Sequence, residues 1–241
     1  MAKRRLDVLL VQRGLAESRE KAQTAILAGD VLVNGEPVLR QAASVAEDAR
    51  IELARAPRFV GRGGEKLEHA LQAFGVDVSS LVAVDVGAST GGFTDCLLQH
   101  GAKRVYAVDV GYGQLDYRLR QDARVVVLER TNVRELSELP ERADVATIDV
   151  SFIGLEKVVP HVVRLLRTGG RIVALVKPQF QAKRSEVGKG GVVRDPQVHA
   201  KVLGRVVAWA AGEGLRFGGL TASPLLGPAG NKEFFVLWQV P

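Results

Sequence analysis

From Leu81 onward, short apolar runs alternate with helical segments, and this alternation constrains the fold more than any other feature of the chain. Such a pattern is typical of parallel strands joined by crossover helices. The sequence therefore predicts an α/β fold with a doubly wound, Rossmann-like sheet. Seven runs have the length and apolar content of strands: residues 81–86, 104–110, 124–128, 144–150, 171–177, 215–221 and 233–240.

A different pattern precedes this region. Residues 6–13 predict one short helix, which Gly14 ends. Ser18 has the residue type and position of an N-cap for a second helix, which Gly29 ends. The sequence therefore predicts two short helices joined by a tight turn near the N-terminus.

Residues typical of β-strands follow these helices. Residues 31–33 and 38–39 flank the turn pair Asn34-Gly35 and predict a β-hairpin, and residues 50–53 predict a further short strand. The composition changes near residues 54–64. The predicted division is a small α+β domain over residues 1–57, a linker over residues 58–64 and the α/β domain over residues 65–241.

The charge balance points to a polyanionic partner. The 241 residues carry a formal net charge of +6, and a surplus of cations is the electrostatic signature of nucleic-acid binding. No apolar run approaches the roughly 18 residues of a membrane-spanning helix. The basic N-terminus is not followed by the apolar core of an export signal, so we expect a cytoplasmic protein that does not enter membranes.

Metal and disulfide chemistry receive no support from the sequence. Cys96 is the one cysteine of the chain, so neither an intramolecular disulfide nor a multi-cysteine metal site is available. The four histidines lie far apart without the spacing of metal ligands. We therefore expect no bound metal and a structural role for Cys96.

A glycine-rich turn follows the first predicted strand. Residues 87–93 lead from Asp85 into a helix, and such a turn lets the backbone approach a ligand closely. A dinucleotide fingerprint would have glycine at position 89, but the chain has Ser89, which disfavours NAD. Asp109 ends the second predicted strand, where a carboxylate accepts hydrogen bonds from ribose hydroxyls. The alternatives are a purely structural turn and a nucleoside cofactor, and the combination with Asp109 favours the cofactor.

Charged residues end two further strands. Asp149 follows the fourth and Lys177 the fifth, so the topology of a doubly wound sheet places both at the carboxyl edge. Glu233 reaches the same edge if the last strand runs antiparallel. Lys66 lies at the start of the helix that we expect after Gly63 and Gly64, before the first strand, and from there it can reach this edge from the side. Each of these residues alone could be an ordinary surface charge.

The N-terminal segment resembles a known RNA-binding fold, the S4-type domain. The resemblance covers residues 4–53 and implies that a basic helical face binds structured RNA, with Arg5, Arg19 and Lys21 as contacts. The alternative is a solvated helix face without a ligand. The motifs that carry the resemblance are Arg5-Leu6-Asp7, Gly14-Leu15-Ala16, Ser18-Arg19, Lys21-Ala22, Gly29-Asp30-Val31 and Val33-Asn34-Gly35.

Five motifs of the remaining chain are similar to those of the TlyA family: residues 85–94 (DVGASTGGFT), 109–115 (DVGYGQL), 131–134 (TNVR), 176–180 (VKPQF) and 227–231 (GPAGN). That family joins an S4-type domain to an FtsJ-like methyltransferase. The resemblance implies 2′-O-methylation of cytidine in ribosomal RNA, with S-adenosylmethionine as methyl donor.

The resemblance also implies roles for individual residues. Lys66, Asp149, Lys177 and Glu233 match the lysine-aspartate-lysine-glutamate tetrad of FtsJ-like 2′-O-methyltransferases, with Lys177 as the favoured base. Asn132 stands where the FtsJ branch has aspartate. The predicted cofactor-binding residues are Asp85 with Gly87, Gly91 and Phe93 on the methionine side, Asp109 at the ribose and Asn132 at the adenine edge.

Two further expectations concern the RNA. Residues 178–196 begin directly after Lys177, and their basic residues, Lys183 and Arg184 among them, predict a mobile RNA-contacting lid. A disordered surface loop is the alternative. The chain ends directly after its last predicted strand, whereas longer TlyA relatives carry an extra C-terminal helical segment. The resemblance therefore implies large-subunit ribosomal RNA as the substrate.

Two functions from other classes remain as alternatives. A non-catalytic RNA-binding or ribosome-assembly protein would keep the fold without binding S-adenosylmethionine. A membrane-active haemolysin is the other, because that name is attached to the family. Neither an export signal nor a spanning segment supports it.

Overall fold

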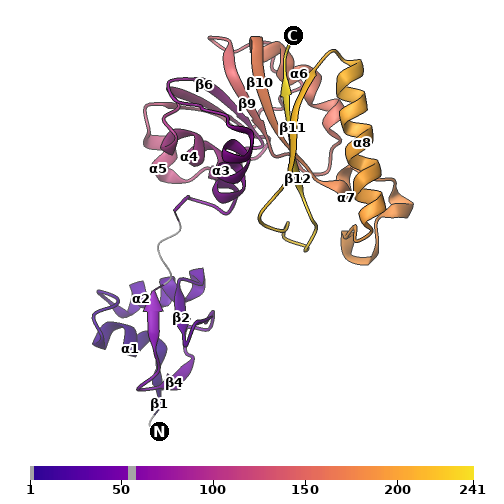
Figure 1. Ribbon diagram of the computed structural model, residues 1–241. Helices are drawn as coiled ribbons and strands as arrows, with labels where there is room; N and C mark the ends of the chain where they lie inside the picture. The colour runs from indigo at the N-terminus through magenta and orange to yellow at the C-terminus, as the bar shows by residue number, and fades with distance from the viewer. Residues whose placement is uncertain (1–2, 54–57) are drawn as a thin grey trace. The chain divides into compact units, whose positions relative to one another are not determined.

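The computed structural model describes residues 3–53 and 58–241, and the chain divides into two compact units, residues 1–58 and 59–241 (Figure 1). No helix of the described ranges is both long and apolar enough to cross a membrane. Each unit has its own hydrophobic core.

The first unit packs two helices against short strands. Its core is built by Leu6, Leu10, Ile26 and Val31, which have no exposed surface. The elements are β1 (Lys3–Arg5), α1 (Leu6–Gln12), α2 (Arg19–Ala28), β2 (Val31–Val33), β3 (Glu36–Pro37), β4 (Ser44–Ala46) and β5 (Ile51–Leu53). β1 pairs with β4, and β2 lies between β3 and β5, all antiparallel.

Most local predictions for this unit are confirmed. The hydroxyl of Ser18 accepts a bond from the backbone N–H of Lys21, and Gly29 ends α2 in the left-handed conformation. The predicted second hairpin strand, residues 38–39, was wrong: Asn34 and Gly35 both have positive φ, so the chain reverses at once and β3 begins at Glu36. The β1–β4 pair was not predicted.

The second unit is a seven-stranded sheet covered by helices on both faces. The order is β11-β12-β10-β9-β6-β7-β8, with β12 antiparallel to both neighbours and the other adjacent pairs parallel. This confirms the predicted doubly wound α/β fold. The strands are β6 (Val82–Val86), β7 (Arg104–Val108), β8 (Val125–Leu128), β9 (Ala143–Ile148), β10 (Leu166–Val176), β11 (Arg216–Ala222) and β12 (Phe234–Gln239).

The helices divide between the two faces of this sheet (Figure 1). α3 (Gly63–Phe74), α4 (Gly92–Gln99) and α5 (Tyr117–Gln121) cover one face, where Leu67, Phe93 and Leu119 share a core cluster. α6 (Val159–Leu165) and α8 (Pro196–Gly212) cover the other, with Val162 and Val206 in its core. α7 (Pro178–Gln181) follows β10, together with two single turns of 3-10 helix, Arg184–Glu186 and Lys189–Gly191; a third turn, Leu155–Lys157, precedes α6.

The segment predicted as a linker, residues 58–64, contains a buried anchor. Phe59 is 3% exposed and packs in the core of the second unit, and α3 already begins at Gly63. A Cβ on Gly64 would lie 2.2 Å from the Phe59 ring. The chain therefore needs glycine here so that α3 can approach Phe59.

This close approach gives a stability prediction. Gly64→Ala should destabilise the second unit by about 1–3 kcal/mol, because the new methyl group overlaps Phe59. Gly204→Ala is the matched control: Gly204 is exposed in α8 with open space around its Cβ position, so it should stabilise by about 0.5–1 kcal/mol. Thermal unfolding of the full chain measures both. Equal unfolding temperatures for G64A and wild type would contradict the packing argument.

Candidate active site

The candidate site lies at the carboxyl edge of the parallel strands. Val86 of β6 is paired with Ile148 of β9, and Val176 of β10 is paired with Phe234 of β12. The residues that follow the parallel strands therefore emerge together. Because β12 is antiparallel, it begins at this same edge, and Glu233 directly precedes its first residue. Lys177 and Glu233 each stand one residue beyond the last strand pair, Val176–Phe234.

Lys177 and Asp149 form the first ion pair of the site. Nζ of Lys177 lies 2.6 Å from Oδ1 of Asp149 and donates to the hydroxyl of Ser151 at 3.0 Å. Lys177 has an extended backbone and directly precedes α7. Proline is favourable as the first residue of this helix, Pro178, because the N–H group at that position has no partner within a helix. Two side chains of the segment that follows β9 thus hold the lysine at the end of the neighbouring strand β10.

Lys66 and Glu233 form the second ion pair. Their Nζ and Oε2 atoms are 2.6 Å apart, and the side chains are 8% and 1% exposed. A Cβ on Gly227 would lie 2.4 Å from Oε1 of Glu233, so this loop needs glycine to close over the carboxylate. Neither charge is tolerated in such surroundings without the other.

A small cavity of about 170 Å³ is lined by Asp149 of the first ion pair and by Gly63, three residues before Lys66. Gly87 and Phe93 also line it. The start of α3 and the carboxyl edge of the sheet therefore lie on opposite sides of this cavity.

A larger cavity of about 550 Å³ continues along the ends of β6 and β7. Both carboxylate oxygens of Asp109 accept backbone N–H groups, one from Ser89 at 2.8 Å and one from Gly111 at 2.7 Å. Gly87 has a φ of +88°, and a Cβ there would lie 2.5 Å from the Asp149 carbonyl oxygen. Asp109 therefore fixes the glycine-rich turn, and Gly87 lets it pass close to β9.

Asn132 also lines the larger cavity. Its Oδ1 accepts from the backbone N–H of Arg134 at 3.1 Å and from Nε of the same residue at 3.2 Å. The side-chain NH₂ group is then the part left to bind a ligand. An aspartate at this position would offer only acceptors, so the substitution changes the polarity of the contact.

Two predicted cofactor residues lie elsewhere than expected. Asp85 is fully buried and accepts from the hydroxyls of Thr94 at 2.7 Å and Thr147 at 2.9 Å, so its side chain does not line either cavity. Gly91 does not line them either; a Cβ there would lie 2.2 Å from Leu119. The geometry corrects the expected direct contacts: both residues shape the turn from beneath.

The structure adds two residues that sequence reasoning missed. Ser151 accepts from Lys177, as described above. Phe152 has a φ of +63° and a ring that is 90% exposed, with its centroid 4.8 Å from that of Phe180. Both residues follow Asp149 after the end of β9, and this position at the carboxyl edge of the sheet is the feature of the sequence that could have indicated them. The strained backbone and the exposure could not be read from the sequence.

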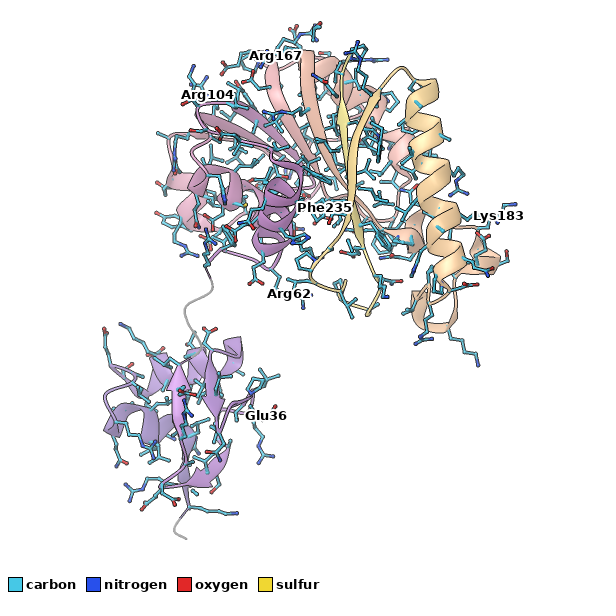
Figure 2. All side chains as sticks on the ribbon, in the orientation of Figure 1. Glu36, Arg62, Arg104, Arg167, Lys183 and Phe235 are labelled. Carbon is cyan, nitrogen blue, oxygen red and sulfur yellow. The ribbon has the colours of Figure 1, made fainter. Side chains whose placement is uncertain are left out.

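The predicted RNA-contacting residues lie on the surfaces of the two units. In the first unit, Arg5 ends β1, Arg19 begins α2, and Lys21 forms an ion pair with Glu17. In the second, Lys183 and its neighbour Arg184 are exposed next to α7 (Figure 2). Residues 178–196, predicted as a mobile lid with a disordered loop as the alternative, contain α7 and two turns of 3-10 helix.

Comparisons with known proteins agree with this geometry. Residues 59–240 match the family model described as FtsJ-like methyltransferase, and residues 4–51 match the S4 domain. The 16S/23S rRNA (cytidine-2'-O)-methyltransferase TlyA of Mycobacterium tuberculosis is 46% identical over 245 residues, covering 99% of this chain and 90% of the relative. The chain belongs to the TlyA family of FtsJ-like methyltransferases. Like other FtsJ-like enzymes, it takes S-adenosylmethionine as methyl donor.

Two other TlyA-family relatives extend the comparison. The YqxC protein of Bacillus subtilis is 52% identical over 241 residues, covering 97% of this chain and 85% of the relative. The 23S rRNA (cytidine-2'-O)-methyltransferase TlyA of Campylobacter jejuni is 32% identical over 178 residues, covering 73% of this chain and 69% of the relative. The family resemblance predicted from the motifs is confirmed.

The buried carboxyl of Asp85 gives a pH prediction. Burial raises the pKa of Asp85 to about 6; the bonds from Thr94 and Thr147 oppose this shift, and the charge of Asp149 adds to it. Between pH 4 and 6 the carboxyl therefore keeps its proton in the folded state but has lost it in the unfolded state, so the free energy of unfolding falls as the pH rises through this range. The loss of stability reaches roughly 3 kcal/mol at pH 7.

Asp85→Asn removes this titration while keeping the shape of the side chain. The free energy of unfolding of D85N should exceed that of wild type by an amount that grows from pH 4 to 6 and is constant above pH 7. Denaturant unfolding of both proteins across this range measures the difference. Parallel stability curves would contradict the raised pKa.

Proposed function

We propose that the chain transfers a methyl group from S-adenosylmethionine to the 2′-hydroxyl of a cytidine in ribosomal RNA. One observation carries this proposal: the ion pairs Lys177–Asp149 and Lys66–Glu233 both lie at the carboxyl edge of the sheet, and Asp149 lines both cavities that open along that edge. The Mycobacterium tuberculosis relative, a 16S/23S rRNA (cytidine-2'-O)-methyltransferase, supports the same reaction.

The residues of the larger cavity suit the adenosyl part of the donor. Each oxygen of the Asp109 carboxylate accepts one N–H and keeps a further lone pair, which can accept from a ribose hydroxyl. The free NH₂ group of Asn132 can donate to a ring nitrogen of adenine. The smaller cavity beside Gly87 and Phe93 has the position required for the methionine part.

The ion pairs suit the activation of a ribose hydroxyl. The donor supplies a methyl group on a sulfonium, and the attacking hydroxyl must lose its proton as the new bond forms. As the O–C bond forms, the C–S bond of the sulfonium breaks and releases a neutral thioether. Lys177 is our proposed acceptor of the hydroxyl proton; it serves as base in its neutral amine form, after losing its own proton, while Asp149 and Ser151 fix the position of its nitrogen. The Lys66–Glu233 pair adds a second amine at the edge and holds α3 against β12.

The exposed ring of Phe152 offers a surface for the target base. An apolar ring that is 90% exposed at a positive φ is unusual for a structural residue. Its contact with Phe180 holds it next to the Lys177 site. Stacking of a cytosine on such a ring contributes about 1–3 kcal/mol and would keep the base outside its helix.

Cations outside the pocket suit the rest of the RNA. Lys183 and Arg184 are exposed just beyond Lys177, and Arg5, Arg19 and Lys21 lie on the S4 domain. We assign them contacts to the RNA backbone, which fix position and not sequence.

The large ribosomal subunit is the proposed substrate. The Mycobacterium tuberculosis relative is named as an enzyme of 16S and 23S rRNA and the Campylobacter jejuni relative as an enzyme of 23S rRNA, so 23S rRNA is the substrate that they share. An enzyme with this substrate works in the cytoplasm, where ribosomal subunits are assembled.

Two variants separate the acceptor side from the donor side. Lys177→Ala should abolish methyl transfer while leaving the Kd for S-adenosylmethionine nearly unchanged, because its assigned role is at the acceptor hydroxyl and it lines neither cavity. Asp109→Ala should weaken donor binding by about 1–3 kcal/mol through lost ribose bonds and a looser turn. Calorimetric titration and a single-turnover methylation assay measure the two effects. A large loss of donor affinity in K177A would refute the role of Lys177.

The choice of subunit has its own test. Purified large and small subunits from cells that lack the gene are each incubated with the enzyme and radiolabelled donor. Label should enter large-subunit RNA, on cytidine 2′-oxygens, and the K177A enzyme should transfer none. Equal labelling of the small subunit would overturn the subunit assignment and leave the reaction standing.

A further inference from the structure

The S4 domain contains a fully buried carboxylate, that of Asp7 in the first turn of α1. It accepts four hydrogen bonds. Arg5 donates from Nε to Oδ1 at 3.0 Å and from Nη2 to Oδ2 at 2.8 Å. Nε of Arg19 and the side-chain amide of Gln23 donate to Oδ2 at 2.9 and 2.7 Å. One buried carboxylate is therefore hydrogen-bonded to three side chains, those of Arg5, Arg19 and Gln23.

These donors come from different elements of the domain. Arg5 ends β1, whereas Arg19 begins α2 and Gln23 lies one turn further along it. The two arginine side chains remain 46% and 55% exposed. Within residues 3–53, Nη1 of Arg5 and both Nη atoms of Arg19 have no protein partner. Asp7 thus holds the inner ends of two guanidinium groups while their outer ends face solvent.

The arrangement is stable against titration. The bonds from Arg5, followed by those from Gln23 and Arg19, hold the pKa of Asp7 well below its usual range despite burial. The carboxylate is therefore ionised at physiological pH, and both arginines stay fixed to it. A buried ion pair is weak evidence of a stabilising role, since its desolvation offsets much of the attraction. The geometry that it imposes on the arginines is its clearer effect.

We propose that Asp7 is a positioning residue for RNA binding, which holds Arg5 and Arg19 as a preformed fork for neighbouring phosphate groups of a folded RNA. The inference rests on the proposed function, because it takes Arg5 and Arg19 to contact RNA. Arginine forks bind phosphate in a fixed plane. Fixing two long side chains beforehand removes an ordering cost that binding would otherwise include.

We expect Asp7→Asn to change the affinity for RNA in the direction opposite to that expected from net charge. Asp7→Asn removes one negative charge, and long-range attraction to RNA alone would make binding tighter. Loss of the fork should instead weaken binding, by about fivefold to a hundredfold for two released side chains. Glu47→Gln is the matched control: Glu47 pairs with exposed Arg4 of the same domain, so removing its charge should leave binding unchanged or slightly tighter.

The experiment measures the Kd of the full-length chain for transcribed, folded 23S rRNA, with poly(U) as an unstructured RNA. D7N should lose affinity for the folded RNA and keep or gain affinity for poly(U), while E47Q loses neither. Donor affinity should not change, because the donor site lies within residues 59–241. Unchanged or tighter binding of D7N to folded 23S rRNA would overturn the inference.

Two arginine variants separate this inference from the proposed function. R5A/R19A should lose folded-RNA binding, and adding D7N to it should change nothing more; wild-type binding by R5A/R19A would refute the RNA contacts themselves. If circular dichroism shows that D7N does not fold, R5K/R19K replaces it, because this variant keeps both charges but has no planar guanidinium groups. R5K/R19K should bind folded RNA as weakly as expected for D7N. Wild-type affinity of R5K/R19K for folded RNA would overturn the inference.

Discussion

The buried ion pair between Lys66 and Glu233 is the interaction on which the rest of the active site depends. Each charge lies in surroundings that would cost about 3–5 kcal/mol if its partner were removed, so α3 and the start of β12 are joined. Because β12 is antiparallel, this places Glu233 beside the end of β10 and next to Lys177. The S4 domain uses a similar device, since buried Asp7 fixes two arginines there.

The order of elements could be predicted from the sequence because it follows from local patterns. Alternating apolar runs gave all seven strands of the sheet, and Ser18 and Gly29 gave the ends of α2. The β1–β4 pair could not be predicted, since three exposed residues, Lys3–Arg5, form β1 and owe their conformation to a distant strand. The burial of Phe59 likewise depends on the close approach of α3.

The candidate site could be predicted where topology decides it. Strand ends delivered Asp149 and Lys177 to one edge, and the direction of the last strand delivered Glu233. Asp85 was misplaced because its burial depends on the threonines that face it, which no local pattern reveals. Phe152 was missed because exposure and a positive φ are properties of the folded chain.

Lys177 is the proposed base of a cytidine 2′-O-methyltransferase of ribosomal RNA, and its role can be measured in cells by mapping 2′-O-methyl groups in that RNA. The chromosomal gene is replaced by its K177A version at equal protein level, and ribosomal RNA from both strains is mapped at nucleotide resolution. We expect a methylated cytidine in the large-subunit RNA of the wild-type strain that is unmethylated in the K177A strain. An identical methylation map in the two strains would contradict it.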